Sequence, residues 1–526
     1  MSADRPHERS LLAQLKHATV RPTRACDGSG RCGRCRVRVT RGACSAPTAA
    51  ERQLLTAAQL QAGHRLACQA HPIGDVELIV LHPATSSPWQ VLPGRESTTA
   101  ELAPTDTLSL AVDLGTTHIR ASLWVPQTGR CLGGRVGDNP QQNWGSDVLC
   151  RLVEAGSTPA TRALMRARVR AAIGEVLATL CDAAACATER VTRVHIVGNT
   201  AMLLLVGDGE PAELIDVDGW SRAVDCPLTD PGALAQRWHL APDARVALEP
   251  PVQGFVGSDL LAAALHTRMA DAAPGTVLID FGTNSEIALW DGERLWVTAA
   301  AGGPSFEASG ISCGMPAEPG AVTAIERDAN GQRTARVLGD VPARGLCGSG
   351  LVSAIATLVD AGLLRPNGRF ARDVLQPVAV AANASELALD ARDVDAFQRA
   401  KAAVGAGVAC LCARASHVQP RELVLCGAFG HHLDPWAATR VGLVPSVDDD
   451  AVAVFAEAAL AGCEQLCVDP TAAQDLVRLR ALIASVNLGT DPSYDQHFVD
   501  QLLLKPLNLS RRPSATAEPG FRELPC

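Results

Sequence analysis

The sequence has no long apolar run and little positive charge. No uncharged apolar segment reaches the length of a membrane span, about 18 residues, and the first residues lack the apolar stretch of an export signal. We therefore expect no membrane contact and a cytoplasmic location. The chain has 47 Lys and Arg against 56 Asp and Glu, and its net charge of -9 offers no basic surface for nucleic acid.

Large aromatic side chains are also scarce, at 3% of residues, so small apolar side chains must allow the helices and sheets to pack closely. Neither G-x-G-x-x-G nor G-x4-G-K-S/T occurs in the right context, which argues against a Rossmann or P-loop nucleotide site. The 526 residues are enough for about three domains, each with its own core.

Cysteine, by contrast, is frequent. The 18 cysteines are spread over a large chain without an export signal, which favours thiols and metal ligands over disulfides. The segment CDGSGRCGRC contains Cys26, Cys32 and Cys35, and Cys68 follows in HRLACQAHP. Four thiolates, three of them from one glycine-rich loop, fit a 2Fe-2S cluster. Zinc and ordinary cysteines are the alternatives, but Cys68 has no second cysteine at the spacing of a zinc knuckle.

Two of the cysteines are followed by strand-like segments, one after Cys35 and one after Cys68. RCRVRVTRG alternates arginine and valine, and VELIVLHP follows Cys68. Residues 10–83 thus resemble the plant-type and adrenodoxin-type ferredoxins, and the five-residue first gap is closer to the adrenodoxin spacing. Because only about 25 residues precede Cys26, we expect the first hairpin of that fold to be shortened or absent. Cys44 is interpreted as an ordinary thiol near the surface.

A strand, an acidic residue, a glycine turn and a second strand occur twice after residue 106. LSLAVDLGTTHIRASLWV contains Asp113, and VLIDFGTNSEIALW contains Asp280, about 167 residues later, which indicates a duplication. The turn amides and hydroxyls can hold phosphate oxygens, and the carboxylates can hold Mg²⁺ or position water. Two plain β-hairpins are the alternative. Residues 84–106, rich in Pro, Ser and Thr, are predicted to be a flexible linker.

Three further glycine turns follow apolar strands or precede apolar helices. VHIVGNTAMLLL contains a buried strand, ARGLCGSGLVSAIATL places Gly348 and Gly350 before a helix, and ELVLCGAFG ends a strand at Gly427. Such turns can bind phosphate, ribose or a base, although each one alone is more often structural.

The order of these segments resembles the superfamily of acetate and sugar kinases, heat-shock chaperone ATPases and actin. More narrowly, the chain resembles the reductive activators of corrinoid proteins, which join a 2Fe-2S ferredoxin domain to such an ATPase. The resemblance covers most of residues 26–500. The segments on which it rests are AVDLGTT, NPQQNWGSDVLCRL, VGNTAM, VLIDFGTNSEIAL, GGPSFEASGISCGMPAEPGAV, GLCGSGL, FQRAKAAVGAGVACL and LVLCGAFG.

The resemblance implies an α/β protein in which a small α+β ferredoxin-like (β-grasp) domain precedes a duplicated ribonuclease-H-like ATPase. The predicted ranges are 1–83 for the ferredoxin-like domain, 84–106 for the linker, 107–275 and 276–508 for the two ATPase lobes, and 509–526 for a disordered tail. The implied activity is the ATP-dependent return of a cobalt(II) corrinoid protein of a methyltransferase system to cobalt(I). The implied cofactors are a 2Fe-2S cluster, ATP and Mg²⁺. The implied partners are that corrinoid protein and an upstream reductase or ferredoxin, and a homodimer of the chain is compatible with this expectation.

The resemblance also implies roles for residues of the repeated turns. Asp113 and Asp280 would handle Mg²⁺ and water, Gly427 would face adenosine, and Glu286 would contact metal or water or else be a solvated strand carboxylate. The phosphates would be held by Gly115, Thr116, Thr117, Gly282, Thr283 and Asn284, with Gly348 and Gly350 completing the nucleotide site. The loop 302–314 would contact the partner or the nucleotide.

Two other functions stay open at this point. A small-molecule kinase regulated by the cluster would need a compact substrate pocket. A redox-sensing, ATP-dependent binding module would respond to the cluster without passing electrons. An activator of a radical dehydratase fits less well, because such activators usually bridge a 4Fe-4S cluster between subunits.

The cysteine spacing generates a direct prediction about metal content. Anaerobically purified protein should contain about two irons and two sulfides per chain. Cys32→Ser should remove or distort the visible absorption, whereas Cys44→Ser should leave it nearly intact. Equal loss of absorption in the two variants would contradict the proposed ligand set.

Overall fold

The structure is a computed structural model that describes residues 10–15, 22, 30, 33, 35–81, 89–98, 102–145, 147–302, 306, 310–507 and 509. Two predicted cluster ligands, Cys26 and Cys32, lie outside the described residues, as do residues 303–305 and 307–309 of the predicted loop 302–314. Within the described ranges, no helix is both long and apolar enough to cross a membrane.

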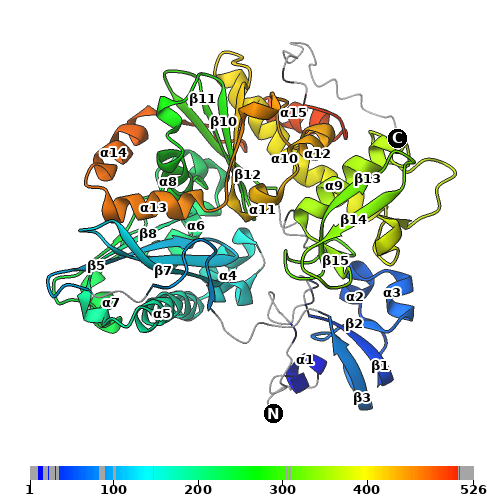
Figure 1. Cartoon of the computed structure of the whole chain (residues 1–526), viewed down its shortest axis with the longest axis horizontal. Coiled ribbons are helices and arrows are strands. Elements are labelled where there is room, and N and C mark those ends of the chain that lie inside the picture. The colour runs from blue at the N-terminus through cyan, green and yellow to red at the C-terminus, as the bar shows by residue number, and fades with distance from the viewer. Residues whose placement is uncertain are drawn as a thin grey trace, which may run out of the picture.

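The N-terminal region forms a small antiparallel sheet with strand order β2-β1-β3, shown in blue in Figure 1. Two short helices cover it, and each begins with a capping box, Thr48 with Glu51 and Thr56 with Gln59. The elements are α1 (Leu11–Gln14), β1 (Arg36–Cys44), α2 (Ala49–Leu54), α3 (Ala57–Gln61), β2 (His64–Leu66) and β3 (Pro72–Val80).

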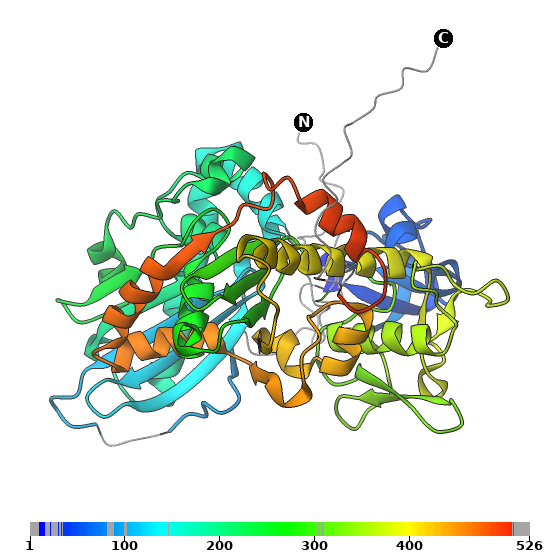
Figure 2. The same ribbon diagram turned by 90° about the horizontal axis from the view of Figure 1, so that it is seen from above.

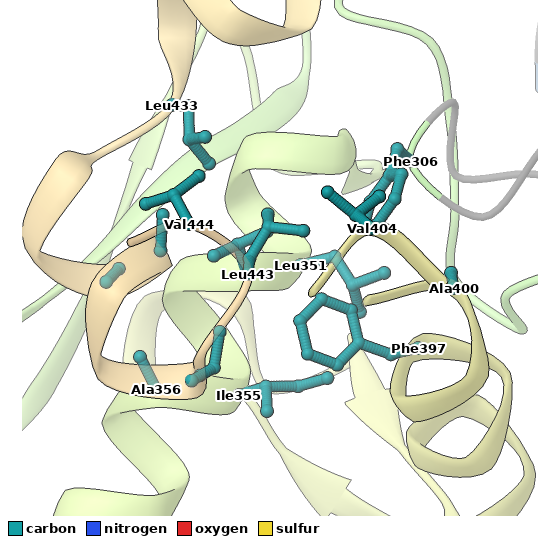
Figure 3. Packing of buried hydrophobic residues seen from close by; sticks show 14 of the residues in the cluster. Phe306, Leu351, Ile355, Ala356, Phe397, Ala400, Val404, Leu433, Leu443 and Val444 are labelled. Atoms are coloured by element: carbon teal, nitrogen blue, oxygen red, sulfur yellow. The ribbon is translucent and has the colours of Figure 1, made fainter. Parts of the chain in front are cut away.

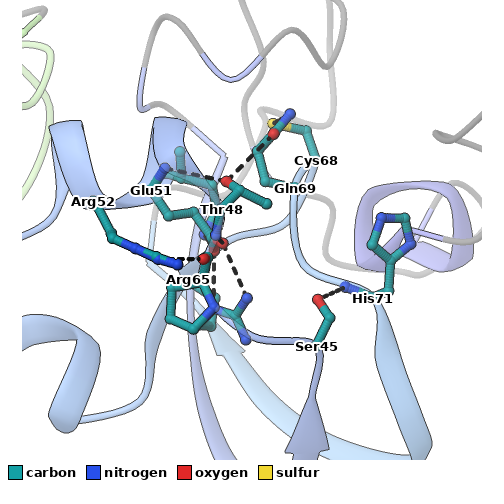
Figure 4. Close-up of polar contacts among 10 residues, drawn as sticks. Ser45, Thr48, Glu51, Arg52, Arg65, Cys68, Gln69 and His71 are labelled. Carbon is teal, nitrogen blue, oxygen red and sulfur yellow. Dashed lines mark hydrogen bonds and ion pairs between the residues drawn. The ribbon is translucent and has the colours of Figure 1, made fainter.

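A buried ion pair fixes the helices of this region to its sheet. The Glu51 carboxylate is fully buried and accepts hydrogen bonds from the Arg65 guanidinium at 2.9 and 3.0 Å and from the Leu66 amide at 3.0 Å (Figure 4). Because both oxygens of the carboxylate are bound, its burial is compensated. This contact holds the start of α2 beside the segment that leads to Cys68.

The first large sheet has six strands in the order β4-β7-β6-β5-β8-β9. Its central strand β5 is buried along its whole length, as a strand covered on both faces must be. The elements of this lobe are β4 (Trp89–Val91), β5 (Leu108–Leu114), β6 (His118–Val125), β7 (Arg130–Asp138), α4 (Val148–Ser157), α5 (Pro159–Ala183), β8 (Val191–Gly198), α6 (Thr200–Val206), α7 (Pro231–Arg237), β9 (Arg245–Leu248) and α8 (Ser258–His266).

The second large sheet has the order β19-β18-β10-β11-β12-β20, and its five strands from β12 to β19 repeat the plan of β7 to β9. In both sheets an antiparallel hairpin is followed by two parallel strands. This repeat agrees with the predicted duplication. The elements of the second sheet and its helices are β10 (Thr276–Phe281), β11 (Ser285–Trp290), β12 (Leu295–Ala300), β18 (Glu422–Cys426), α11 (Gly427–His432), α12 (Pro435–Val441), β19 (Val452–Phe455), α13 (Ala458–Val468), α14 (Ala472–Leu482), β20 (Ile483–Ser485) and α15 (Tyr494–Gln501).

A large insertion separates β12 from β18 and extends the second lobe toward the N-terminal sheet (Figures 1 and 2). Its helices α9 and α10 share a core in which Phe306, Leu351, Ile355 and Phe397 pack together (Figure 3). The elements are β13 (Ala321–Arg327), β14 (Arg333–Val337), β15 (Gly345–Leu346), α9 (Gly348–Asp360), β16 (Val378–Ala379), β17 (Ala388–Leu389) and α10 (Ala391–Arg414).

The two lobes are joined by a close crossing of α8 and α13. Apolar residues of α8 pack against the second sheet, whereas Leu460 and Cys463 of α13 pack with Ala111 and Val197 of the first sheet. The helices approach so closely that a Cβ atom on Gly462 would lie 2.0 Å from the Ala262 carbonyl oxygen. Each lobe therefore contributes a helix that packs on the sheet of the other lobe.

Part of the predicted linker differs from the prediction. Trp89–Val91 forms β4, which pairs with β7 at the edge of the first sheet. Arg95 then forms a two-bond ion pair with Glu464 of α13, at 2.6 and 2.7 Å. These contacts correct the expectation of a flexible linker for residues 89–98. The other predicted domain limits stay predictions.

The helix crossing predicts a strong size limit at Gly462. Gly462→Ala should lower the free energy of unfolding of the ATPase lobes by roughly 1–3 kcal/mol, because the methyl group would meet backbone atoms that cannot move aside. Gly156→Ala in α4 is the control, since only one side-chain atom lies near its added Cβ, at 4.0 Å. Urea unfolding measures both variants, and equal effects would contradict the close crossing.

Candidate functional site

The two repeated glycine turns face each other between the lobes. The hydroxyl groups of Thr117 and Thr283 form a hydrogen bond of 3.0 Å, although 166 residues separate them in sequence. Thr116 accepts a hydrogen bond of 2.8 Å from the Asn199 amide, which follows β8. The fold thus places the Thr hydroxyls of both turns and the residue after β8 at one location.

The backbone of each turn is closed by a short hydrogen-bonded loop. The Gly115 amide donates to the His118 carbonyl at 3.0 Å, and the Gly282 amide donates to the Asn284 carbonyl at 2.9 Å. The second turn is one residue shorter, because Leu114 pairs with Ile119 whereas Phe281 pairs with Ser285. The two turns are therefore similar but not identical in length.

Carboxylates with raised pKa values lie at the strand ends beside these turns. The pKa of Asp113 is raised to about 6 by burial, and that of Asp280 is raised to about 7 by burial together with the negative charges of Asp113 and Glu457. Glu286 pairs in register with Asp280 and is 6% exposed. Burial, with Asp259 and Asp280 nearby, raises the pKa of Glu286 well above its ordinary value. The alternative of a solvated strand carboxylate is wrong for Glu286.

Asp259, which lies in the first turn of α8, was not predicted from the sequence. Burial raises the pKa of Asp259 to about 8, and the charges of Asp113 and Asp280 add to the increase. In the sequence, Asp259 is the single acidic residue of the segment GSDLLAAAL, which lies between the two repeats and begins an apolar helix. This segment was the only sequence signal for its position. Its position beside both repeated aspartates arises from the packing of α8 between the sheets.

A second missed group provides positive charge. Arg120 pairs in register with Asp113 on β6 and lies 3.6 Å from its carboxylate and 2.7 Å from the carboxylate of Glu457. Arg120 and Glu286 occupy equivalent positions in the two hairpins, because each pairs with the repeated aspartate of its own hairpin. The two halves of the site are therefore electrostatically different.

The predicted glycines divide into two groups. Gly427 has a left-handed φ of +82°, and a Cβ there would lie 2.8 Å from the Asp280 carboxylate oxygen, so the turn passes directly beside this carboxylate. Gly348 packs against the Phe306 carbonyl and the Phe429 ring, and Gly350 packs against the Val322 carbonyl of β13. The contacts of Gly348 and Gly350 are thus structural, and their predicted nucleotide role rests on sequence alone.

The donor set of this site fits a nucleotide with a divalent cation. Threonine hydroxyls and turn amides can donate hydrogen bonds to phosphate oxygens. The raised pKa values disfavour the ionised carboxylates, and a nearby cation would stabilise that ionised form. The buried hydroxyls of Thr200 and Ser285, next to the turns, make no hydrogen bond within the described part of the chain. Among the described residues, no three His, Cys, Asp or Glu side chains could hold a metal together. Magnesium, which is commonly bound by one or two carboxylates together with water and phosphate, does not need such a set.

Two of the four predicted cluster ligands lie in the N-terminal region. Cys35 and Cys68 are buried, and the Cys35 carbonyl accepts a hydrogen bond of 2.8 Å from the Ala67 amide, directly before Cys68. Gly30 and Gly33 adopt left-handed φ values of +77° and +66°, as expected for a loop that turns around a cluster. Soft thiolates on a glycine loop suit an iron-sulfur group. Cys44, the last residue of β1, is half-buried.

Three family models match successive parts of the chain. A 2Fe-2S iron-sulfur cluster binding domain matches residues 2–72, the RACo middle region matches 108–272, and the C-terminal ASKHA domain of RACo matches 275–516. Each RACo model covers one of the two hairpins that bear Asp113 and Asp280. The first model identifies a 2Fe-2S domain, and the third identifies an ATPase-type domain.

Two curated proteins and one solved structure are similar to the chain. The corrinoid activation enzyme RamQ of Eubacterium limosum is 27% identical over 423 residues, 74% of this chain and 69% of that protein. The Co(II) methylated amine-specific corrinoid protein reductase of Methanosarcina barkeri is 25% identical over 49% of this chain and 52% of its own length. The reductive activator for corrinoid, iron-sulfur protein has the same fold, with a TM-score of 0.66 at 22% identity, over 96% of this chain and 97% of that one.

The raised pKa values predict that the carboxylates lower the stability of the nucleotide-free protein. Asp280 ionises near 3.8 when unfolded and near 7 when folded, so the unfolded state binds fewer protons between these values and stability falls as pH rises. We expect Asp280→Asn to exceed the wild type in free energy of unfolding by on the order of 2 kcal/mol at about pH 8, and by much less at about pH 4.

Urea unfolding at both pH values measures this difference. Glu293→Gln, which changes an exposed carboxylate in the turn between β11 and β12, is the matched control. A gain for Asp280→Asn that does not change with pH would contradict the raised pKa of this carboxylate.

Proposed function

Because the chain belongs to the RACo family of reductive activators, we propose that it is an ATP-dependent enzyme that returns a cobalt(II) corrinoid protein of a methyltransferase system to the cobalt(I) state. The observation that carries this proposal is the hydrogen bond between Thr117 and Thr283, which brings two phosphate-type turns together in a chain that also bears a 2Fe-2S domain. An ATPase lobe pair and an electron carrier in one chain suit a reduction that needs both.

The free energy involved is modest. Plant-type 2Fe-2S centres have potentials near roughly -400 mV, and each 59 mV uphill costs a one-electron transfer about 1.4 kcal/mol. Closure of two lobes around ATP can supply a few kcal/mol when the closed form binds the partner differently from the open form. The proposed use of ATP is thus to change how the lobes hold the corrinoid protein, so that the cobalt becomes easier to reduce.

Residues of the site have proposed roles in this reaction. Asp113 and Asp280 would bind Mg²⁺ directly or through water. The hydroxyls of Thr116, Thr117 and Thr283, the Asn284 amide and the amides of the turns, Gly115 and Gly282 included, would bind phosphate oxygens, and Gly427 would lie beside the adenosine. Asp259, with a pKa of about 8, would accept a proton from the attacking water, and Glu286 would orient that water.

The cluster side has proposed roles as well. Cys26, Cys32, Cys35 and Cys68 would hold a 2Fe-2S cluster, which supplies single-electron transfer when bound. An upstream reductase or ferredoxin would be the electron donor. A cytoplasmic location stays a prediction, and so does the choice between a monomer and a homodimer.

Asp280→Asn tests the proposal in the full chain. With a cobalt(II) corrinoid protein, a strong reductant and MgATP, we expect the variant to form cobalt(I) on the order of 100-fold more slowly than the wild type, because phosphate-bound Mg²⁺ loses a carboxylate. The cobalt spectrum measures the rate, and the iron content and cluster absorption should stay unchanged. Glu293→Gln should behave as the wild type.

Two outcomes would contradict the proposal. Wild-type cobalt reduction by Asp280→Asn would remove the predicted site from the reaction. Phosphorylation of a small molecule, without any cobalt reduction by the wild type, would favour the cluster-regulated kinase instead.

A further inference from the structure

Arg36 connects the cluster loop to the second ATPase lobe. It directly follows Cys35 at the start of β1, and it is only 7% exposed. Its Nε atom donates to the Gly33 carbonyl at 3.1 Å, inside the cysteine loop. Its Nη2 atom donates to the Ile311 carbonyl at 3.2 Å, and its Nη1 atom donates to the Ser312 carbonyl. One guanidinium thus joins two regions that are 275 residues apart in sequence.

The loop that receives Arg36 is held firmly on its far side. The Ser312 amide and hydroxyl both donate to the Asp393 carboxylate, at 2.6 and 2.7 Å. Asp393 is 2% exposed and lies in the first turn of α10, where it also closes the capping box with Asp390. Gln59 of the N-terminal region adds a hydrogen bond of 3.3 Å to the Ser312 carbonyl. The contact therefore consists of buried polar groups with defined partners.

The same loop leads to the nucleotide side of the lobe. The Cys313 carbonyl accepts a hydrogen bond of 2.7 Å from Leu346, two residues before Gly348. Phe306, earlier in the loop, packs its ring against Phe429 at a centroid distance of 5.3 Å and against Phe281 at 5.9 Å. Phe281 directly follows Asp280, and Phe429 lies two residues after Gly427. Figure 3 shows Phe306 beside Phe397 and Val404 of α10.

We propose that Arg36 is a positioning residue that couples the cluster loop to the nucleotide site through the loop 311–313. In this arrangement, a shift of Phe281, Phe429 or the start of α9 when nucleotide binds moves the carbonyls of Ile311 and Ser312. Arg36 transmits that movement to Gly33 and hence to the cysteine loop. The inference rests on the proposed function, because it needs both a cluster and a nucleotide in one chain.

Such coupling must be reciprocal. If nucleotide binding changes the midpoint potential of the cluster, the redox state of the cluster changes nucleotide affinity by the same free energy. A tenfold difference in affinity corresponds to about 59 mV for a one-electron couple. Two independent measurements must therefore agree.

The experiment uses the full chain with its cluster and the probe Mg-AMPPNP, a non-hydrolysed ATP analogue. Its dissociation constant is measured with oxidised and with reduced cluster, and the midpoint potential is measured with and without it. For the wild type we expect an affinity ratio of about fivefold or more and the matching shift in potential. For Arg36→Gln we expect a ratio under about twofold and no shift, with nucleotide binding and cluster content retained.

Three further variants separate positioning from charge and folding. Arg38→Gln removes the same charge from an exposed position on the same strand and should keep the coupling. Arg36→Lys keeps the charge but cannot reach three carbonyls with a planar fork, so it should lose most of the coupling. Asp393→Asn releases Ser312 from the opposite side, without any change in the cluster domain, and should weaken the coupling too.

Hydrogen exchange adds a readout that does not depend on activity. Amides of residues 311–315 should exchange faster in Arg36→Gln than in the wild type, and Mg-AMPPNP should change their exchange only in the wild type and Arg38→Gln. Full coupling in both Arg36→Gln and Asp393→Asn, or none in a wild type that binds both groups, would overturn the inference. A wild type that lacks the cluster or does not bind Mg-AMPPNP would instead contradict the proposed function on which it rests.

Discussion

The close crossing of helices α8 and α13 is the contact on which the rest of the structure depends. Gly462 allows the backbones of the two helices to touch, and each helix packs on the sheet of the other lobe. The strand ends that bear Asp113 and Asp280 are thereby brought to one place. Glu464 of α13 strengthens the contact, because it accepts hydrogen bonds from Ser122 of the first sheet at 2.6 Å and from Arg95.

This arrangement places several carboxylates close together, so their negative charges repel one another at the site. Burial raises the pKa values of Asp113, Asp259, Asp280 and Glu286, and the negative charge of Asp113 adds to the increase at the other three. The described structure places Arg120 among them, with Glu457 sharing its charge. Buried groups with perturbed pKa values are typical of functional sites, because binding of a cation relieves the repulsion that folding imposes. A cation bound at this site would restore the stability that the free protein lacks.

The sequence predicted those features that depend on local pattern. The repeated turns after β5 and β10 were found because an aspartate, a glycine and a threonine recur in the same order. Asp259 was missed because its importance comes from the position of α8 between two sheets, which no short motif records. The composition of Trp89–Val91 predicts a linker, whereas the segment forms a three-residue edge strand that is defined by its pairing with β7.

The cluster region shows the same division. The spacing of Cys26, Cys32, Cys35 and Cys68 predicted a ligand set, and the matched 2Fe-2S model agrees with that kind of domain. Arg36 was seen only as one member of an alternating strand. Its contacts with Ile311 and Ser312 join distant parts of the chain, so they could be found only in three dimensions.

Simultaneous measurement of cobalt(I) formed and ATP hydrolysed tests the central claim most directly. The wild-type protein, with its cluster, is mixed with a cobalt(II) corrinoid protein and a reductant held at a fixed potential, and MgATP is varied. The account predicts that cobalt(I) appears only as ATP is consumed, with both rates rising together. Cobalt(I) formed at the same rate and to the same extent without ATP would contradict it.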